Sequence, residues 1–428
     1  MPVSWFDGSV TLIAEAGLSA ATGTYGAWDA SLWDTATWGP DAQWTDVSAY
    51  LRGFQSDRKF GREVTAWDPA TAAFVLNNRD GRFSSDNLSG PYVVAGVSGV
   101  RPWRPFRLRA TYGGVTYPVY TGYGEDWLDT WVPGHLDAFV TVPCVDEMAA
   151  FAAADGFAVA SQGAGETSGL RIHRVLNAAG HTGARNVMVG RVTMQATDLS
   201  KNVATELKLV TDSEGGGLFI DADGTVVFED QYALMEQTRS NTIQATFGDG
   251  TGSELPCRDM TPTNGGKTIK NVASFTRVGG TAQVVSDATS RVLYGPVDKR
   301  ETRTDLVCET DAQALGLATF FVQRYKDPKK RFSQIQIKPR ASPAALWPQV
   351  LGRRVRDLVR VVARPLGSPT VTRDCHIAGI HHQVTGDDWV TTFDLWDATV
   401  YQTYKSSRWD VGTWGAFDGD TSAAAWFF

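Results

Sequence analysis

Few of the features that mark enzymes, membrane proteins or disulfide-rich proteins occur in this sequence of 428 residues. Its four cysteines are Cys144, Cys257, Cys308 and Cys375, and each lies more than fifty residues from the next. No CxxC pair is present, so we expect buried thiols rather than a disulfide framework or a zinc site.

The sequence also lacks an apolar run near the roughly 18 residues that a membrane-spanning helix needs. Its first residues, MPVSWFDGSV, contain neither a basic segment nor an apolar one, so we expect no signal peptide. These two absences predict a chain without a membrane span that is made in a cytoplasm.

Basic residues are fewer than acidic ones, because 40 Lys and Arg against 47 Asp and Glu give a net charge of -7. A surface that binds duplex nucleic acid needs a basic patch, so this balance argues against one. The sequence has no GxSxG, HExxH or GxxxxGKS/T motif, and no GxGxxG motif follows a predicted strand. We therefore expect neither an enzyme nor a bound cofactor.

Glycine and tryptophan are abundant instead, with 43 and 15 residues, which favours short strands, many turns and large aromatic anchors. Segment 269–295 is the clearest case, since it reads as two strands around Gly279 and Gly280. Two glycines suit a type I′ turn, in which both central residues take positive φ. That turn would place Phe275 opposite Val284 on one buried face of the hairpin.

Alternating strand patterns predict a mainly β (α+β) fold with two antiparallel β-barrel-like modules and an inserted α/β domain. In the first module, the runs 106–112 and 115–122 read as neighbouring strands. The expected divisions are a Trp-rich N-terminal extension at 1–44, a first β-module at 45–144, an α/β insert at 145–263, a second β-module with one helix at 264–398, and a Trp-rich C-terminal extension at 399–428.

Helices are predicted where apolar residues recur at helical spacing behind a capping residue. One begins after Thr167 and stops at Gly180, and another runs from about residue 198 to 210. A third spans 310–325, with acidic and basic residues placed to match the helix dipole. Segment 221–224, DADG, is interpreted as a hairpin turn rather than a calcium loop, because the further ligands of such a loop are missing.

A repeated aromatic motif brackets the chain. WDTATWG at 33–39 returns as WDVGTWG at 409–415. One interpretation is a pair of compact turns whose tryptophans cover a barrel end, and the other is an adhesive surface, since Trp is enriched in interfaces. The candidate interface residues are Trp28, Trp33, Trp38, Trp409, Trp414 and Trp426.

Three further groups of polar residues are weaker candidates for chemistry. His376 and His382 would share one strand face while His381 points the other way, which favours core or solvent histidines over a metal site. Glu125, Asp126 and Asp129 lie near Trp127 and Trp131, and this is the one cluster where glycan chemistry could be sought. The basic runs 326–331 and 353–356 are interpreted as solvated helix ends or loops.

Several segments together resemble the minor tail proteins, or baseplate hub proteins, of siphoviruses that infect actinobacteria. They are VSAYLRGFQSDRKFGRE and FVLNNRDGRFS at 47–84, SGLRIHRVLNAAG and DSEGGGLFIDADGTVVFED at 168–230, and NVASFTRVGG and LGRRV at 271–355. The resemblance implies a trimer in which two similar barrels per subunit form a pseudo-sixfold ring, without a cofactor. It also implies a virion location at the tail tip and contacts with the distal tail protein, the tape measure protein and tip or fibre proteins.

Two functions are therefore expected from the sequence. The first is a structural hub that closes the tail tube, joins it to tip proteins and lets DNA pass without specific binding. The alternative is a carbohydrate-binding adhesin or tail-tip glycosidase that acts on the host cell surface through the Trp-rich ends.

Overall fold

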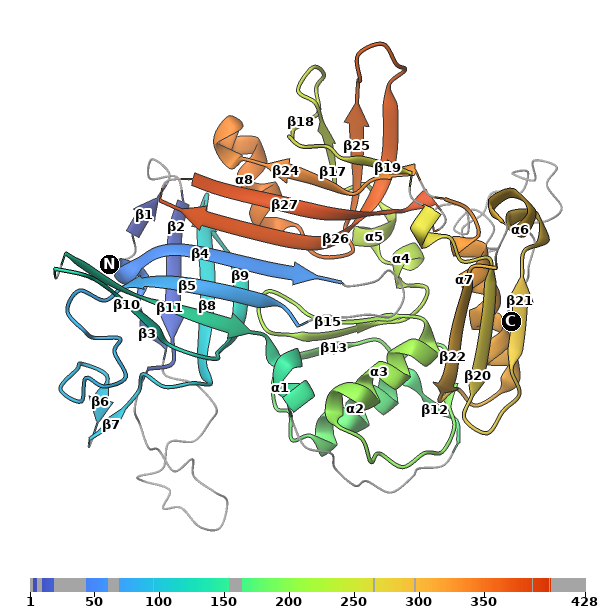
Figure 1. The fold of residues 1–428 in the computed structure, drawn as a ribbon, viewed down its shortest axis with the longest axis horizontal. Helices are drawn as coiled ribbons and strands as arrows, with labels where there is room; N and C mark the ends of the chain where they lie inside the picture. The colour runs from blue at the N-terminus through green and yellow to red at the C-terminus, as the bar shows by residue number, and fades with distance from the viewer. Residues whose placement is uncertain are drawn as a thin grey trace.

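The computed structural model describes residues 3–5, 10–18, 44–60, 69–94, 96–134, 136–153, 164–264, 266–295, 298–328, 330–386, 388–399 and 401. Figure 1 shows a large β-sheet together with a smaller part in which helices cover short strands. The protein is mainly β with a minority of helices, as the alternating patterns predicted.

The largest sheet contains fifteen strands. They are β1 (Val3–Trp5), β2 (Val10–Ala16), β3 (Thr45–Asp46), β4 (Leu51–Lys59), β5 (Thr71–Asn77), β8 (Arg104–Tyr112), β9 (Val115–Gly124), β10 (Leu128–Val132), β11 (Asp137–Val145), β17 (Ala245–Gly248), β18 (Leu255–Pro256), β24 (Gln334–Ile337), β25 (Leu358–Ala363), β26 (Val371–Thr385) and β27 (Asp388–Asp397).

The remaining elements are short strands in smaller sheets, α-helices and 3-10 turns. The strands are β6 (Val93–Val94), β7 (Val97–Ser98), β12 (Glu166–Thr167), β13 (Arg185–Val187), β14 (Thr193–Met194), β15 (Gly217–Ile220), β16 (Val226–Glu229), β19 (Pro262–Asn264), β20 (Val272–Arg277), β21 (Gln283–Ser286), β22 (Arg300–Leu306) and β23 (Lys330–Phe332). The helices are α1 (Glu147–Ala153), α2 (Ser168–Ala178), α3 (Val203–Glu214), α4 (Ala233–Glu236), α5 (Thr238–Asn241), α6 (Ala288–Tyr294), α7 (Asp311–Tyr325) and α8 (Pro343–Gly352), with 3-10 turns at Ser48–Tyr50, Gly266–Thr268 and Pro339–Ala341.

One strand pair joins the N-terminal and C-terminal strands into a single sheet. β4 pairs antiparallel with β26, from Gly53 opposite Thr385 to Lys59 opposite Gly379. β4 therefore lies between β5 of the N-terminal strands and β26 of the C-terminal strands (Figure 1). Strands far apart in the sequence are thus held together by an unbroken set of backbone hydrogen bonds.

The strand order of this sheet runs from β1 to β18 without returning to its start. No closed barrel is seen among the described residues, so the expectation of two barrel-like modules stays a proposal. One side of β4 pairs with β5 and the other with β26, so the N-terminal strands continue into the C-terminal ones.

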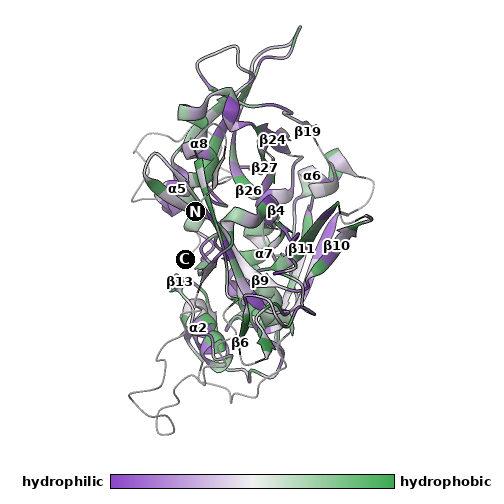
Figure 2. Cartoon of the chain, turned by 90° about the vertical axis from the view of Figure 1, so that its left-hand side faces the viewer, coloured by the Kyte–Doolittle hydropathy of each residue, from purple (hydrophilic) through white to green (hydrophobic). Residues whose placement is uncertain are grey.

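Alternating side chains build the core of this sheet. Phe54 on β4 and Phe74 on the paired strand β5 have ring centroids 5.0 Å apart, and the ring of Phe106 on β8 lies 5.2 Å from that of Phe74. The same apolar cluster continues into the C-terminal part, where Trp347 of α8 and Trp389 of β27 meet edge to face at 5.2 Å. Figure 2 shows the matching alternation of hydrophobic and hydrophilic residues along strands such as β10 and β11.

The helices of the α/β part follow the capping signals in the sequence. The hydroxyl of Thr167 accepts from the backbone of α2, and Gly180 follows that helix with a φ of +69°. The DADG segment forms the turn of the β15–β16 hairpin, as predicted, and Leu218 lies opposite Phe228. These predictions are confirmed.

A second core combines this α/β part with β20, β22 and α7. Its apolar cluster contains residues from Met148 to Val322, whereas the cluster of the large sheet resumes at Phe332. Residues of the expected second module therefore contribute to both clusters. The module boundaries drawn from the sequence stay a proposal.

The register predicted for the 269–295 hairpin is wrong by one residue. Phe275 lies opposite Gln283, and Val284 lies opposite Ser274. Only Gly279 has a positive φ, of +71°, so the turn is not type I′. Because a one-residue slip moves a side chain to the other face, Val284 is 56% exposed while Phe275 is fully buried.

The four cysteines are buried and free, as predicted. Among the described residues, no helix is long and apolar enough to cross a membrane.

Candidate functional site

The two cores meet at a junction of buried ion pairs. Arg58, on β4, is 6% exposed and lies with Nη1 3.5 Å from Oδ1 of Asp221. Arg354 approaches the other oxygen of the same carboxylate, with Nε 3.4 Å from Oδ2. Asp221 begins the turn between β15 and β16, so this carboxylate ties the large sheet to the α/β part.

Arg356 makes the most buried contact of the junction. Its Nε lies 2.7 Å from Oε2 of Glu229, at the end of β16, and the residue is only 4% exposed. Burial lowers the pKa of Arg356 and raises that of Glu229, while the opposite charge of each partner counteracts the shift of the other. A side chain on Gly217 would place its Cβ 2.0 Å from Nη1 of Arg356, so glycine is needed there.

The backbone of Arg356 is unusual as well. Its φ is +73°, a conformation that costs a residue with a Cβ roughly 1 to 2 kcal/mol. Its N–H donates to the carbonyl of Ile377 on β26 at 2.7 Å. The left-handed conformation therefore lets one residue bond to β26 through its backbone and to β16 through its side chain.

A third pair connects helix α5 to the same segment. Arg239 binds Asp357 through two hydrogen bonds, of 2.7 and 2.8 Å, and also donates to the carbonyl of Gly352. Two-point contacts of this kind fix orientation as well as distance. Segment 353–357 thus holds β4, the β15–β16 hairpin and α5 in one arrangement, and we call it the arginine junction.

This arrangement corrects the interpretation of residues 353–356 as a solvated basic loop. The side chains of Arg353 and Arg356 are only 15% and 4% exposed, and that of Arg354 is 53% exposed. The sequence contained the arginines, but the carboxylates Asp221 and Glu229 are distant in the chain, so no spacing pattern could pair them.

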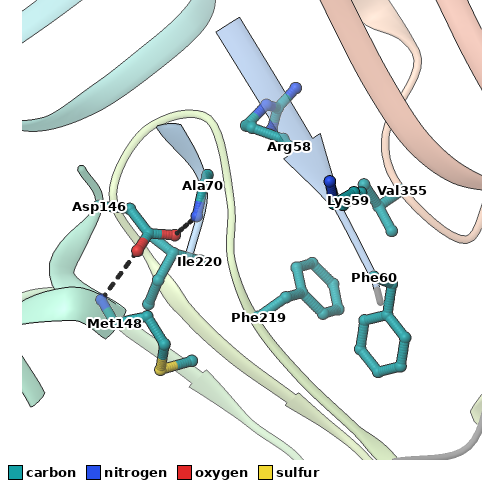
Figure 3. Close-up of a pocket in the computed structure, with 9 residues that line it drawn as sticks. All are labelled: Arg58, Lys59, Phe60, Ala70, Asp146, Met148, Phe219, Ile220 and Val355. Atoms are coloured by element: carbon teal, nitrogen blue, oxygen red, sulfur yellow. Dashed lines mark hydrogen bonds between the residues drawn. The ribbon is translucent and has the colours of Figure 1, made fainter. Parts of the chain in front are cut away.

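Beside the junction, the packing leaves a small cavity (Figure 3). It measures about 20 Å³, which is room for one water molecule. Asp146 points into this region and accepts hydrogen bonds from the backbone N–H groups of Ala70 and Met148, at 2.9 and 3.0 Å. Ligand pockets are usually an order of magnitude larger, so the chemistry here is structural.

His381 lies across the joint between β4 and β26. Its Nδ1 is 3.2 Å from Oδ1 of Asp57 on β4, and its Nε2 is 2.8 Å from Oδ2 of Asp394 on β27. Burial opposes protonation, but the hydrogen bonds to Asp394 and Asp57 outweigh it and raise the pKa of His381 to about 9. A protonated His381 therefore links three neighbouring strands.

The other two histidines of this strand, His376 and His382, are both buried; the sequence had left a core and a solvent position open for them. His376 and His382 are at most 4% exposed, and burial lowers the pKa of each to about 3. His376 donates from Nε2 to the carbonyl of Ser240 at 2.8 Å, if that nitrogen carries the proton. Both are neutral packing residues.

Near Trp127, two of the three acidic side chains make local hydrogen bonds. Trp127 is buried and donates from Nε1 to the carbonyl of Arg101 at 2.9 Å. Asp129 accepts a 2.8 Å hydrogen bond from Asn78, and Asp126 bonds to the backbone N–H of Trp127. Glu125, Asp126 and Trp131 of this group are exposed, Trp131 at 70%.

The candidate interface tryptophans Trp28, Trp33, Trp38, Trp409, Trp414 and Trp426 lie outside the described residues. Their role stays a prediction. The junction and the His381 link, in contrast, were not predicted as sites from the sequence.

Comparison with known proteins identifies the fold. No family model matches the chain, and no curated protein sequence matches it. A tail protein from Neisseria meningitidis MC58 has a similar structure, with a TM-score of 0.57 and 12% identity over 92% of this chain and 98% of the other. The 43 kDa tail protein of prophage MuSo2 from Shewanella oneidensis gives a TM-score of 0.56 and 12% identity over 91% and 99%. The chain therefore has the fold of these tail proteins.

Proposed function

We propose that this chain is a structural protein of a phage tail tip, specifically the baseplate hub of a siphovirus that infects actinobacteria. Three copies would form a ring that closes the tail tube, joins it to tip or fibre proteins and lets DNA pass during infection. The observation that supports this proposal is the match in fold to two tail proteins over more than nine-tenths of each chain.

The arginine junction would keep the large sheet and the α/β part of each subunit in one orientation, which such a ring needs. A ring that continues a tube must keep the same angle between its parts in every subunit. Buried ion pairs resist change because removing one partner leaves an uncompensated charge, which costs about 3 to 5 kcal/mol. The Arg356–Glu229 pair is of this buried kind, and it holds the large sheet and the α/β part in a fixed relation.

The proposal includes the surroundings of the ring. Its partners would be the distal tail protein, the tape measure protein and the tip proteins, and the two Trp-rich motifs would contact them. No cofactor is needed, because the role is positioning. The protein would be made in the bacterial cytoplasm and end in the virion.

The test uses the phage that encodes the chain. Gene deletion should yield heads and tails that lack a finished tip and do not infect, and supplying the gene in trans should restore infection. Antibody against the chain should label restored particles at the tail end. Label along the whole tail shaft, or particles with a complete tip after deletion, would contradict the proposal.

The alternative, an adhesin or glycosidase, predicts a different deletion phenotype. Particles would then be complete but would not adsorb to host cell walls. Complete, non-adsorbing particles would therefore favour that function over the hub.

A further inference from the structure

Two unpaired strand edges with exposed apolar side chains lie at opposite ends of the molecule. In Figure 1, whose horizontal direction is the longest axis, β10 lies near one end, and β21 and α6 lie near the other. Exposed apolar residues that occur singly are normal on a protein surface. At these two ends they instead accompany a strand that pairs with only one other strand among the described residues.

The first end is the hairpin of β10 and β11. β10 pairs only with β11 among the described strands, with an unbroken register from Leu128 opposite Thr141 to Val132 opposite Asp137. Leu128, Trp131 and Leu136 are 48%, 70% and 74% exposed. The hairpin thus presents large apolar groups to solvent without using them in its own core.

The usual protection of an edge strand is missing from β10. Its sequence, LDTWV, contains no lysine and no proline, and its ladder contains no bulge. Its one charged residue, Asp129, is bonded to Asn78. An unprotected edge of this kind is suited to accept a strand from another chain.

The second end is formed by β21 and α6. β21 is an outer strand of the order β21-β20-β22, and its sequence, QVVS, is uncharged. Val284 on β21 is 56% exposed, and Val292 and Leu293 on α6 are 84% and 64% exposed. In the observed register Val284 lies opposite Ser274 and faces away from the core, on this exposed surface.

We propose that these two ends bind each other between copies of this chain, with β10 of one copy lying along β21 of the next. The occupant is a second copy because the two surfaces differ, match in chemistry and lie at opposite ends of one chain. Contacts between two different patches produce rings or filaments rather than two-fold dimers. This inference rests on the proposed ring and names the surfaces that close it.

Trp131 is the expected energetic centre of the contact. Tryptophan is over-represented among residues that dominate interface energies once water is excluded. Trp131→Asp and Val284→Lys should each weaken self-association of the full-length chain by roughly tenfold or more. Leu366→Asp is the matched control, since Leu366 is fully exposed, at 104%, but lies at neither end.

The decisive variant carries both changes, Trp131→Asp and Val284→Lys, in one chain. In a head-to-tail contact every interface would then bring the introduced carboxylate of one copy to the introduced ammonium group of the next. Association should therefore recover above that of either single variant. It is measured by mass photometry and sedimentation across a concentration series, and circular dichroism melts check that all variants remain folded.

The expected result is a trimer for the wild type and for Leu366→Asp, monomers for each single variant, and a partial return of trimer for the double variant. A wild-type chain that stays monomeric or forms only dimers overturns the inference, as does a single variant that associates normally or a double variant that shows no recovery. Self-association of the isolated chain tests only this contact. The gene-deletion experiment tests the proposed tail function, so either one can fail without the other.

Discussion

Two hairpins of this protein each have two consecutive glycines in the loop between their strands, but the two turns differ. In the hairpin of β8 and β9, Gly113 and Gly114 have φ of +58° and +81°, and Tyr112 pairs directly with Val115. This is the two-residue loop that two glycines favour. In the hairpin of β20 and β21, Gly280 lacks a positive φ, and the paired residues stop at Phe275 and Gln283.

The difference arises from residues outside the second hairpin. Asp311, at the start of α7, accepts a 2.7 Å hydrogen bond from Arg277 and a 2.8 Å bond from the hydroxyl of Thr281. The N–H of Val278 donates to the carbonyl of Leu306 at the end of β22. These contacts draw the loop residues away from the β20–β21 ladder and widen the turn.

The comparison shows where local sequence determines structure. A glycine pair sets the turn at 113–114, where no other residue lies within 4 Å of a Cβ at either glycine. At 279–280, bonds to a helix start and to a neighbouring strand outweigh the local preference. A hairpin register is thus predictable from its turn only when no distant side chain bonds to the loop.

The largest expected effect is that of Phe275→Ala. Phe275 is fully buried, with its ring 5.5 Å from that of Phe321 and 4.8 Å from the guanidinium carbon of Arg303. Loss of this side chain should lower the free energy of unfolding by about 3 to 5 kcal/mol. Chemical denaturation measures it. A loss below about 1 kcal/mol would show that the second hairpin does not anchor its core.

The second effect is a dependence of stability on pH through His381. Its pKa is about 9 in the folded protein and about 6.5 when unfolded, so the stabilisation is complete below pH 6.5 and is lost as pH rises to 9. We expect a loss of roughly 1 to 3 kcal/mol over this window. Unfolding midpoints measured between about pH 6 and 9.5 should show it, and His381→Gln should show a smaller slope. An equal slope in the variant would contradict the link between β4 and β27.

A third, smaller effect is the difference in how alanine substitutions at Gly114 and Gly280 destabilise the protein. Gly114→Ala keeps free space around its Cβ but requires a positive φ, so it should destabilise by about 1 to 2 kcal/mol. Gly280→Ala needs no unusual φ, yet its Cβ would lie 2.3 Å from Oδ1 of Asp311. The destabilisation caused by Gly280→Ala should therefore be smaller when Asp311 is also replaced by Ala. The destabilisation caused by Gly114→Ala should be the same with and without Asp311→Ala. Thermal melts of the four variants measure this, and equal behaviour in both backgrounds would refute the role of Asp311.

The smallest effect is that of Val284→Ala. Because Val284 is exposed, we expect the free energy of unfolding of the monomer to change by no more than about 0.5 kcal/mol. The same denaturation experiment checks this. If Val284→Ala instead lowers the free energy of unfolding about as much as Phe275→Ala, Val284 is buried. The hairpin then has the register with Phe275 opposite Val284.

Elements with their signals close together in the chain were predictable. The helix expected at 310–325 is α7, where Thr310 and Gln313 form a capping box, and the turn expected at 221–224 joins β15 to β16. The arginine junction was not predictable, because Arg356 and Glu229 meet only after β16, β25 and β26 have assembled. The joint of β4 with β26 has the same origin, since either strand could have paired within its own module.

Electron cryomicroscopy of the intact particle tests the proposal that this chain forms the ring of a phage tail tip. We predict density at the end of the tail tube into which three copies of the described fold fit around the tube axis, with β10 of each beside β21 of the next. Density for the chain along the shaft or in a peripheral fibre, or no such density at all, would rule out a ring of this chain at the tail tip.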